Sequence, residues 1–210
     1  MRDQNDTSMK DYENTASEDR WHIVAMALLY ILIAGAIQHY TSYPWDADTA
    51  YHAAVGQLIR EHGILHSFPW TPFSILADHY ADKELLFHLL FVPLTGLSYV
   101  TAAKIVGTLS GATLLLAMYL ILRAERVKFA GLWALVPLAA SGYFFFRFAI
   151  VRPFVLSIAL TVVMLWAFSR RKPVVLVVCS ALYPWLYVQR ALRGRRLLRP
   201  AVRGRRLPSR

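Results

Sequence analysis

The 210-residue chain is 57% hydrophobic and only 17% charged, with a mean hydropathy of +0.39. This composition leaves too little polar surface for a soluble globular domain, so we expect an all-α polytopic membrane protein. The formal charge of +10 does not indicate a nucleic-acid partner, because subtracting the nine arginines of residues 190–210 leaves only +1 for the rest of the chain. The only cysteine, Cys179, lies in an apolar run, which excludes an internal disulfide and predicts a buried hydrophobic side chain.

The first part of the chain predicts a tail followed by a membrane span. Residues 1–20 are polar and acidic, which favours a disordered cytoplasmic tail over a cleavable signal peptide. Residues 21–39 carry no formal charge when histidine is neutral, and about nineteen helical residues can cross a hydrocarbon core of ~30 Å. We expect this segment to be an uncleaved anchor in the inner (plasma) membrane, with the N-terminus in the cytoplasm.

An outer loop is expected over residues 40–100, before the next long apolar run. It holds two aspartates, Asp46 and Asp48, and then a helical pattern in which Asp48 is the expected N-cap and Gly63 the expected C-cap. The apolar and polar residues of this helix fall on different sides, which predicts that it lies along the membrane surface. The polar residues of the loop must then face water on one side of the bilayer.

Residues 84–98 form a short apolar run that leaves the number of spans open at five or six. If the run lies at the surface, the basic turns at residues 123–128 and 170–172 both face the cytoplasm. The positive-inside rule favours this arrangement over the alternative, in which the run crosses and both turns move outside. We therefore expect a transmembrane domain of residues 21–188 with spans at 21–39, 101–122, 129–146, 153–168 and 173–188.

The arrangement with five spans brings Arg147 and Arg152 to the same outer face as the two aspartates. Pro153, which follows Arg152, is tolerated in the first turn of the next span. The alternative for both arginines is that their side chains extend to lipid headgroups.

Residues 189–210 differ abruptly in composition from everything before them, with arginines recurring throughout. Three explanations remain open for this segment: a disordered basic tail that binds anionic lipid, a miscounted span, or an out-of-frame reading beyond Tyr187. The richness in Arg, Gly, Pro and Leu favours the last of these.

Asp46 and Asp48 are the candidate catalytic residues. On a helix their side chains would point away from each other, so they converge only if the backbone before the helix is extended or turning. Such a pair can bind a divalent cation such as Mg²⁺ or Mn²⁺, or supply one carboxylate as a general base. The alternative is a helix cap beside a solvated acid. His52, one helical turn after Asp48, favours a functional role and is a secondary candidate.

Four basic residues are candidates for binding a phosphate at the membrane surface, such as that of a lipid: Lys83, Lys104, Arg147 and Arg152. The alternatives are a loop charge for Lys83 and extension to the lipid headgroups for Lys104. His88 is a further secondary candidate. Because His66, His79 and His88 lack the spacing of a zinc motif, we predict no zinc site.

Four short motifs follow one another along the chain: DxDxxxH, HG, PFS and RPxxxS. They are carried by Asp46, Asp48 and His52; His62 and Gly63; Pro72, Phe73 and Ser74; and Arg152, Pro153 and Ser157. Over residues 21–188, their order and spacing resemble the N-terminal part of the GT-C superfamily of membrane glycosyltransferases, which includes protein mannosyltransferase and aminoarabinose transferase relatives. The resemblance is greatest to a mostly uncharacterised bacterial subgroup.

The resemblance implies inverting transfer of a sugar from a polyprenyl-phosphate donor to an envelope acceptor, with Asp46 or Asp48 as base or metal ligand. It also implies basic residues on the departing lipid phosphate. Lys83 falls near the position of a family lysine. Lys104 stands where mannosyltransferase relatives carry an arginine, and a lysine in that place keeps the charge but loses the bidentate geometry of a guanidinium. Family members have many more spans, so we expect a truncated chain with a half-built site, and whether that site is active or inactive stays open.

Two other classes of function stay open. The first is a non-catalytic polytopic membrane protein, as a subunit or a transporter-like protein, although the expected spans lack the mid-membrane charged pairs typical of transport. The second is a lipid-surface binder that acts through the arginine-rich tail. The sequence predicts membrane lipid as a partner in every case and does not indicate an oligomeric state.

Overall fold

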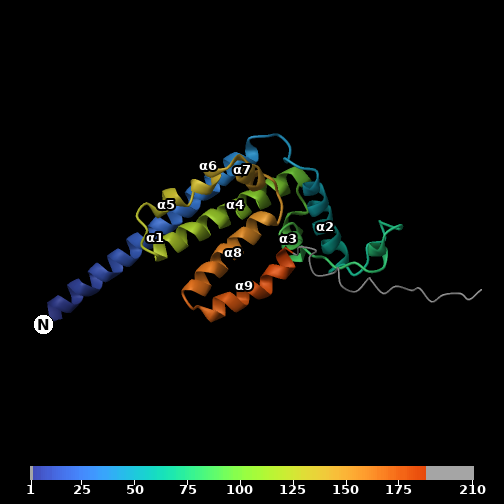
Figure 1. Cartoon of the computed structure of the whole chain (residues 1–210). Helices are drawn as coiled ribbons and strands as arrows, with labels where there is room; N and C mark the ends of the chain where they lie inside the picture. Colours follow the sequence, from blue (N-terminus) through green and yellow to red (C-terminus); the bar gives the residue numbers. More distant parts are fainter. Residues whose placement is uncertain (1, 188–210) are drawn as a thin grey trace, which may run out of the picture.

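The computed structural model describes residues 2–187 and is built from helices, with no strand in that part of the chain (Figure 1). The arginine-rich segment 189–210, with its three explanations, lies outside the described residues. In chain order the helices are α1 (Arg2–His39), α2 (Asp48–His62), η1 (Ile75–Ala77), α3 (Leu85–Leu89), η2 (Val92–Leu94), α4 (Tyr99–Ala124), α5 (Ala130–Trp133), α6 (Val136–Ala140), α7 (Gly142–Ala149), α8 (Phe154–Ser169) and α9 (Pro173–Leu186).

Helix α1 begins at Arg2, whereas the sequence predicts a disordered tail as far as residue 20. The polar residues of this segment cannot form a core of their own. They do, however, continue a long apolar helix, and extending an existing helix avoids the unfavourable nucleation step. This extension of the apolar helix explains why the structure has a helix where the sequence predicts a disordered tail.

Two of the described helices are long and apolar enough to cross a membrane: residues Asp19–His39, and α4. A third crossing is possible if α7 and α8, which are bent by 113° at their junction, are taken as one span. Figure 1 shows α1 and α4 side by side, with α5, α6 and α7 following the same direction as α1. These apolar helices indicate a membrane-associated protein.

Residues 129–146, predicted as one span, do not form one continuous helix. Pro137 lies in the first turn of α6, a position at which a helix does not need the missing N–H. The proline ring also prevents the preceding helix α5 from continuing through this position. Ser141 has an extended backbone and starts α7, because its side chain accepts a hydrogen bond from the N–H of Phe144 at 3.3 Å. Proline and a capping serine thus divide this apolar segment into α5, α6 and α7.

The run 84–98 folds as the short helices α3 and η2 and not as a span. Its helical part, Leu85–Leu94, would measure about 15 Å at 1.5 Å per residue, half of the hydrocarbon core. Phe87 and Phe91 are fully buried and pack on α4 through Val106. The run is therefore part of a protein core, and its helical part is short for a membrane span.

The main core lies between α1, α4, α7 and α8. It contains Tyr30 and Ala34 of α1, Leu114 of α4 and Phe148 of α7, all almost completely buried. Cys179 of α9 is also buried, at 7% exposure, which confirms the predicted environment of this thiol. Burial of these side chains fixes how the helices run alongside one another.

A second core lies where α2 and α3 pack against the start of α4, the start of α8 and the end of α9 (Figure 1). Gly56 of α2 lies against Phe91, and a Cβ at this position would be only 2.5 Å from the Phe91 Cβ. At the same end, the buried Gln38 of α1 donates from Nε2 to the carbonyl oxygen of Ala149, 3.0 Å away. This hydrogen bond holds the segment after α1 close to the segment between α7 and α8.

Candidate functional site

Helix α2 spans Asp48–His62 and ends at Gly63, which has a positive φ of 77°, as the sequence predicts. The prediction that Asp48 caps its N-terminus is wrong, because Ala47 occupies the N-cap position. Asp46 satisfies the first turn instead. Its Oδ1 accepts a hydrogen bond from the backbone N–H of Thr49 at 3.3 Å and another from the Thr49 hydroxyl.

Arg152, just before α8, joins the two aspartates although it is 106 residues from Asp46 in sequence. Its Nε donates to Asp46 Oδ2, and its Nη2 lies 2.7 Å from Asp48 Oδ2. The Asp46 side chain is 12% exposed, that of Arg152 34% and that of Asp48 58%. The two carboxylates that point apart on an ideal helix thus converge on one guanidinium, because Asp46 lies in the turn before α2.

The two carboxylates carry one negative charge more than the guanidinium neutralises. Asp46 is held by Thr49 and Arg152, whereas Asp48 is mostly exposed and pairs through one oxygen only. The Nη1 amino group of Arg152 takes part in neither of the two ion pairs. The arrangement therefore offers a water-facing carboxylate oxygen next to a guanidinium with donors to spare.

Behind this cluster, a chain of buried hydrogen bonds joins α2 to the segment before α3. His88 donates from Nδ1 to Asp82 Oδ2 at 2.6 Å, and its Nε2 lies 2.9 Å from His52 Nδ1. With the His88 proton on Nδ1, Nε2 must be the acceptor and His52 Nδ1 the donor. The second oxygen of Asp82 accepts from the backbone N–H of Glu84 at 2.9 Å.

The two histidines are buried, with 3% of His52 and none of His88 exposed. The pKa of the His52 imidazole is lowered to about 3, chiefly by burial and next by the neighbouring His88. The Tyr51 ring lies 5.4 Å from the ring of His52 and 5.6 Å from that of His88, and Phe87 meets His52 edge-on at 5.0 Å. His52 is therefore a neutral imidazole within an aromatic shell.

The other three candidate cations do not join the Asp46, Asp48 and Arg152 cluster. Lys83 is 53% exposed and lies 3.6 Å from Glu84 Oε1. Lys104 donates to the carbonyl oxygen of Thr41 at 2.9 Å. Arg147 donates to the Tyr143 hydroxyl and covers the rings of Tyr143 and Phe154.

Sequence reasoning missed Thr49, Asp82 and Glu84. Thr49 follows Asp46 at the spacing of a capping contact, and Glu84 precedes His88 by four residues, the spacing at which two side chains share one helix face. These spacings were visible in the sequence. The partner of Glu84 and His88, His52, is 36 residues from His88 and could be found only from the fold.

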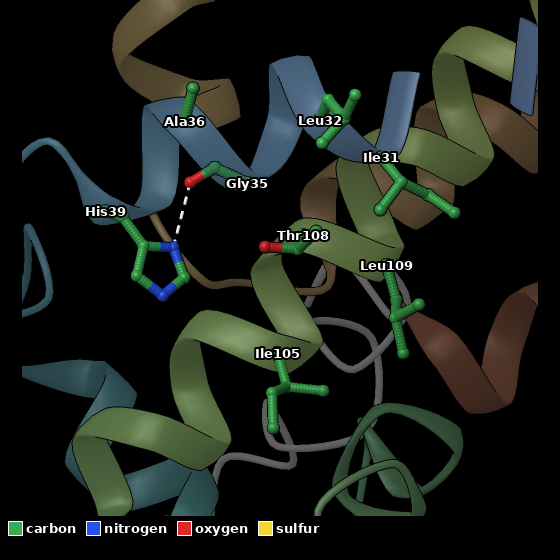
Figure 2. A pocket seen from close by; sticks show the side chains of 8 residues that line it. All are labelled: Ile31, Leu32, Gly35, Ala36, His39, Ile105, Thr108 and Leu109. Atoms are coloured by element: carbon green, nitrogen blue, oxygen red, sulfur yellow. Dashed lines mark hydrogen bonds between the residues drawn. The ribbon is translucent and has the colours of Figure 1, made fainter. Parts of the chain in front are cut away.

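A separate hollow of about 470 Å³ lies between α1 and α4. Figure 2 shows its lining, which is apolar apart from Thr108 and His39, and His39 donates from Nδ1 to the carbonyl oxygen of Gly35 at 2.9 Å. Ile31, Leu32, Ile105 and Leu109 are the larger apolar side chains of this lining. A surface of this kind suits a hydrocarbon chain.

Comparison with protein-family models, with curated proteins and with solved structures finds no match to this chain. The contacts of Arg152 with the two aspartates are the main structural indication of function in this chain.

Proposed function

We propose that this protein is a membrane glycosyltransferase of the GT-C type that transfers a sugar from a polyprenyl-phosphate donor to an envelope acceptor. The observation that carries the proposal is the joining of Asp46, Asp48 and Arg152 at one end of the helix bundle. Transfer from a lipid phosphate needs a base for the acceptor and a cation for the departing phosphate, and both are present in this cluster.

In the proposed reaction Asp48 accepts the proton of the acceptor hydroxyl, because it is the more exposed of the two carboxylates. The acceptor oxygen forms a bond to the anomeric carbon while the bond from that carbon to the phosphate oxygen breaks, so the configuration inverts. The bonding electrons leave with the lipid phosphate, whose added charge is stabilised by the Nη1 group of Arg152. Asp46 positions Arg152 through its ion pair.

Lys83 is the second proposed phosphate ligand, since its exposed ammonium lies beside Glu84 at the same end of the bundle. Lys104 and Arg147 are held by Thr41 and Tyr143, and they serve the proposal only as membrane-surface cations. His52 and His88 support α2 from behind and do not touch the substrate in this scheme.

A divalent cation such as Mg²⁺ or Mn²⁺ fits poorly between Asp46 and Asp48, because the Arg152 guanidinium already bridges both carboxylates. A cation there would have to displace the guanidinium and would be repelled by it. The proposed reaction therefore uses no metal ion at Asp46 and Asp48.

We further propose that the chain crosses the inner (plasma) membrane five times, with the N-terminus in the cytoplasm. The passes would be residues 21–39, α4, the α5–α7 segment, α8 and α9. Two ion pairs support this topology: Arg123 lies 2.7 Å from Asp19, and Arg170 pairs with Glu125. These contacts bring both basic turns to one end, away from Arg152, as the positive-inside rule requires.

The test is sugar transfer in membranes that contain the protein, supplied with radiolabelled polyprenyl-phosphate sugars. Asp48→Asn should lower transfer by about 100-fold or more, the usual loss on removal of a general base, without changing membrane insertion. Asp78→Asn is the matched control, because Asp78 is an exposed acid of the same loop. Equal transfer by Asp48→Asn and the unchanged protein would remove Asp48 from the mechanism, and no transfer by an inserted chain would contradict the function.

A second candidate is a non-catalytic polytopic membrane protein. It is favoured by the completeness of the ion pairs, since Arg152 is already neutralised by two carboxylates of its own chain. In that case Asp46→Asn would lower the melting temperature in detergent, and no variant of Asp48 would change a transfer rate. The two candidates are separated by measuring transfer and melting temperature on the same variants.

A further inference from the structure

The buried His52, Glu84 and His88 are a group that the proposed reaction does not use. His52 comes from α2, Glu84 is the N-cap of α3, and His88 lies one turn further along. One ligand atom from each, His52 Nδ1, His88 Nε2 and a Glu84 oxygen, lies within 4.8 Å of the other two. His52 Nδ1 is 2.9 Å from His88 Nε2 and 3.9 Å from Glu84 Oε2.

We propose that His52, Glu84 and His88 form a binding site for a divalent transition metal of the zinc type, independent of the glycosyltransferase proposal. Zinc bonds to imidazole nitrogen at about 2.0–2.1 Å, which places two tetrahedral ligand nitrogens about 3.3 Å apart. The nitrogens of His52 and His88 therefore need to separate by only a few tenths of an ångström. The Glu84 Oε2 atom, 3.9 Å from His52 Nδ1, needs to approach by about 0.6 Å to reach the same spacing.

The surroundings of the pair fit this role. A histidine that binds a metal usually donates its other ring N–H to a carboxylate, which fixes the tautomer and makes the ligand nitrogen more basic. His88 does so to Asp82, whose side chain is only 3% exposed. Asp82 is itself held by the backbone N–H of Glu84. Metal binding thus uses a contact that already orients His88 Nε2 toward His52.

The ligands present decide the kind of metal. Two imidazole nitrogens and one carboxylate oxygen suit Zn²⁺, Co²⁺ and their neighbours, whereas Mg²⁺ prefers six oxygen ligands, several of them water. Three protein ligands leave a fourth tetrahedral position for water or another donor.

Metal binding also requires no net loss of protons from the two histidines. In the hydrogen-bonded pair the proton of neutral His52 lies on Nδ1. When the metal takes that nitrogen, the proton moves to Nε2 of the same ring, so the two histidines release none. The burial that keeps the His52 imidazole neutral favours its role as a ligand. The metal would then join α2 to α3 and raise the stability of this end of the bundle.

The experiment uses the full chain in detergent, stripped of metal and titrated with Zn²⁺ and with Co²⁺. We expect one Zn²⁺ per chain, a higher melting temperature, and the intense visible absorption of tetrahedral Co²⁺. Glu84→Gln and His88→Gln should each weaken metal binding at least 10-fold, the size of effect seen when metal-site partners are removed. His79→Gln, an exposed histidine of the same loop, should bind like the unchanged chain.

Two results would overturn the proposal. One is the absence of stoichiometric Zn²⁺ or Co²⁺ binding by a chain that melts cooperatively, which would leave the group as a hydrogen-bonded cluster. The other is equal binding by Glu84→Gln and His79→Gln. Because Glu84→Gln keeps the shape of the side chain, a loss of binding with an unchanged metal-free melting temperature would not be a folding defect. Sugar transfer is not measured, so failure here leaves the proposed reaction standing.

Discussion

The two ends of the helix bundle differ in how far their charged side chains are exposed to water. At the site end, formed by the loop before α2, α2 itself, α3 and the start of α8, the side chains of Asp82 and His88 are almost completely buried and that of Asp46 is 12% exposed. At the basic end, formed by the turns 123–128 and 170–172, Arg170 is 52% exposed and Glu125 30%. The site end therefore buries the carboxylates of Asp82 and Asp46, although Asp48 stays 58% exposed, whereas the basic end leaves the Arg170 and Glu125 pair largely in contact with water.

Charged side chains at the two ends should contribute differently to the stability of the fold. An exposed ion pair contributes about 0–1 kcal/mol, because water and salt screen it, while a buried group that loses its partner costs several times as much. Substitutions at the site end should accordingly have large effects on stability, and those at the basic end small ones. The following predictions test this contrast.

The largest effect is expected for His88→Ala. This change removes a fully buried ring and leaves the Asp82 carboxylate without the hydrogen bond at 2.6 Å. We expect a loss of about 3 kcal/mol or more in unfolding free energy, measured by denaturant titration in detergent with a chelator present. His66→Ala, at an exposed histidine, is the control. A loss as small as that of the control would mean that the Asp82, His88 and His52 chain does not stabilise the fold.

A second effect should follow acidification. The pKa of His52 is lowered in the folded protein to about 3 by burial, whereas in the unfolded chain it has its ordinary value of 6.5. The unfolded state thus binds a proton first, so the stability contributed by neutral His52 is complete above pH ~6.5 and declines as the pH falls toward about 3. Between pH 6.5 and pH 5 the loss is about 2 kcal/mol.

The measurement is the melting temperature against pH, with chelator, for the unchanged chain and for His52→Gln. The two proteins differ in this one side chain, so the difference between the two curves isolates the imidazole of His52. We expect a shallower curve for His52→Gln between pH 7 and pH 5. Parallel curves would show that the environment of His52 does not disfavour its protonation.

Several features of the site end could be predicted from the sequence because they depend on local spacing or on charge. Helix α2 and its Gly63 cap follow from periodicity and from the positive φ that glycine allows. The placement of Arg152 with the aspartates follows from counting basic residues on each side of the membrane. The roles assigned to these residues remain predictions, since position alone does not test them.

Other features depend on tertiary packing and could not be read from spacing. The hydrogen bond between His52 and His88 forms only because Gly56 lets α2 approach Phe91. Pro137 and Ser141 divide residues 129–146 into separate helices. The sequence prediction of a single span relied on the apolar composition of this segment and gave these two residues too little weight. The absence of zinc-motif spacing excluded a zinc site within one segment, but not a site assembled from two.

A smaller effect is expected for Gly56→Ala. A Cβ there would meet the Cβ of Phe91 at 2.5 Å and the carbonyl oxygen of His88 at 3.2 Å, and neither atom belongs to the flexible end of a side chain. Helix α2 must shift away from α3, at a cost of about 1–3 kcal/mol in unfolding free energy. Gly96→Ala is the matched control, because nothing lies within 4 Å of a Cβ at Gly96. Equal unfolding free energies of the two variants would show that α2 does not pack as closely against α3 as this distance requires.

The smallest effect is expected at the basic end, for Glu125→Gln. Glu125 pairs with Arg170 and accepts from the Trp166 indole N–H at 3.0 Å, and glutamine keeps an oxygen for the indole while removing the charge. Because Arg170 is half exposed, we expect a change below about 1 kcal/mol that disappears in high salt, measured by the same denaturant titration. A salt-independent loss as large as that of His88→Ala would mean that the basic end is held together by desolvated charge, and the contrast between the two ends would fail.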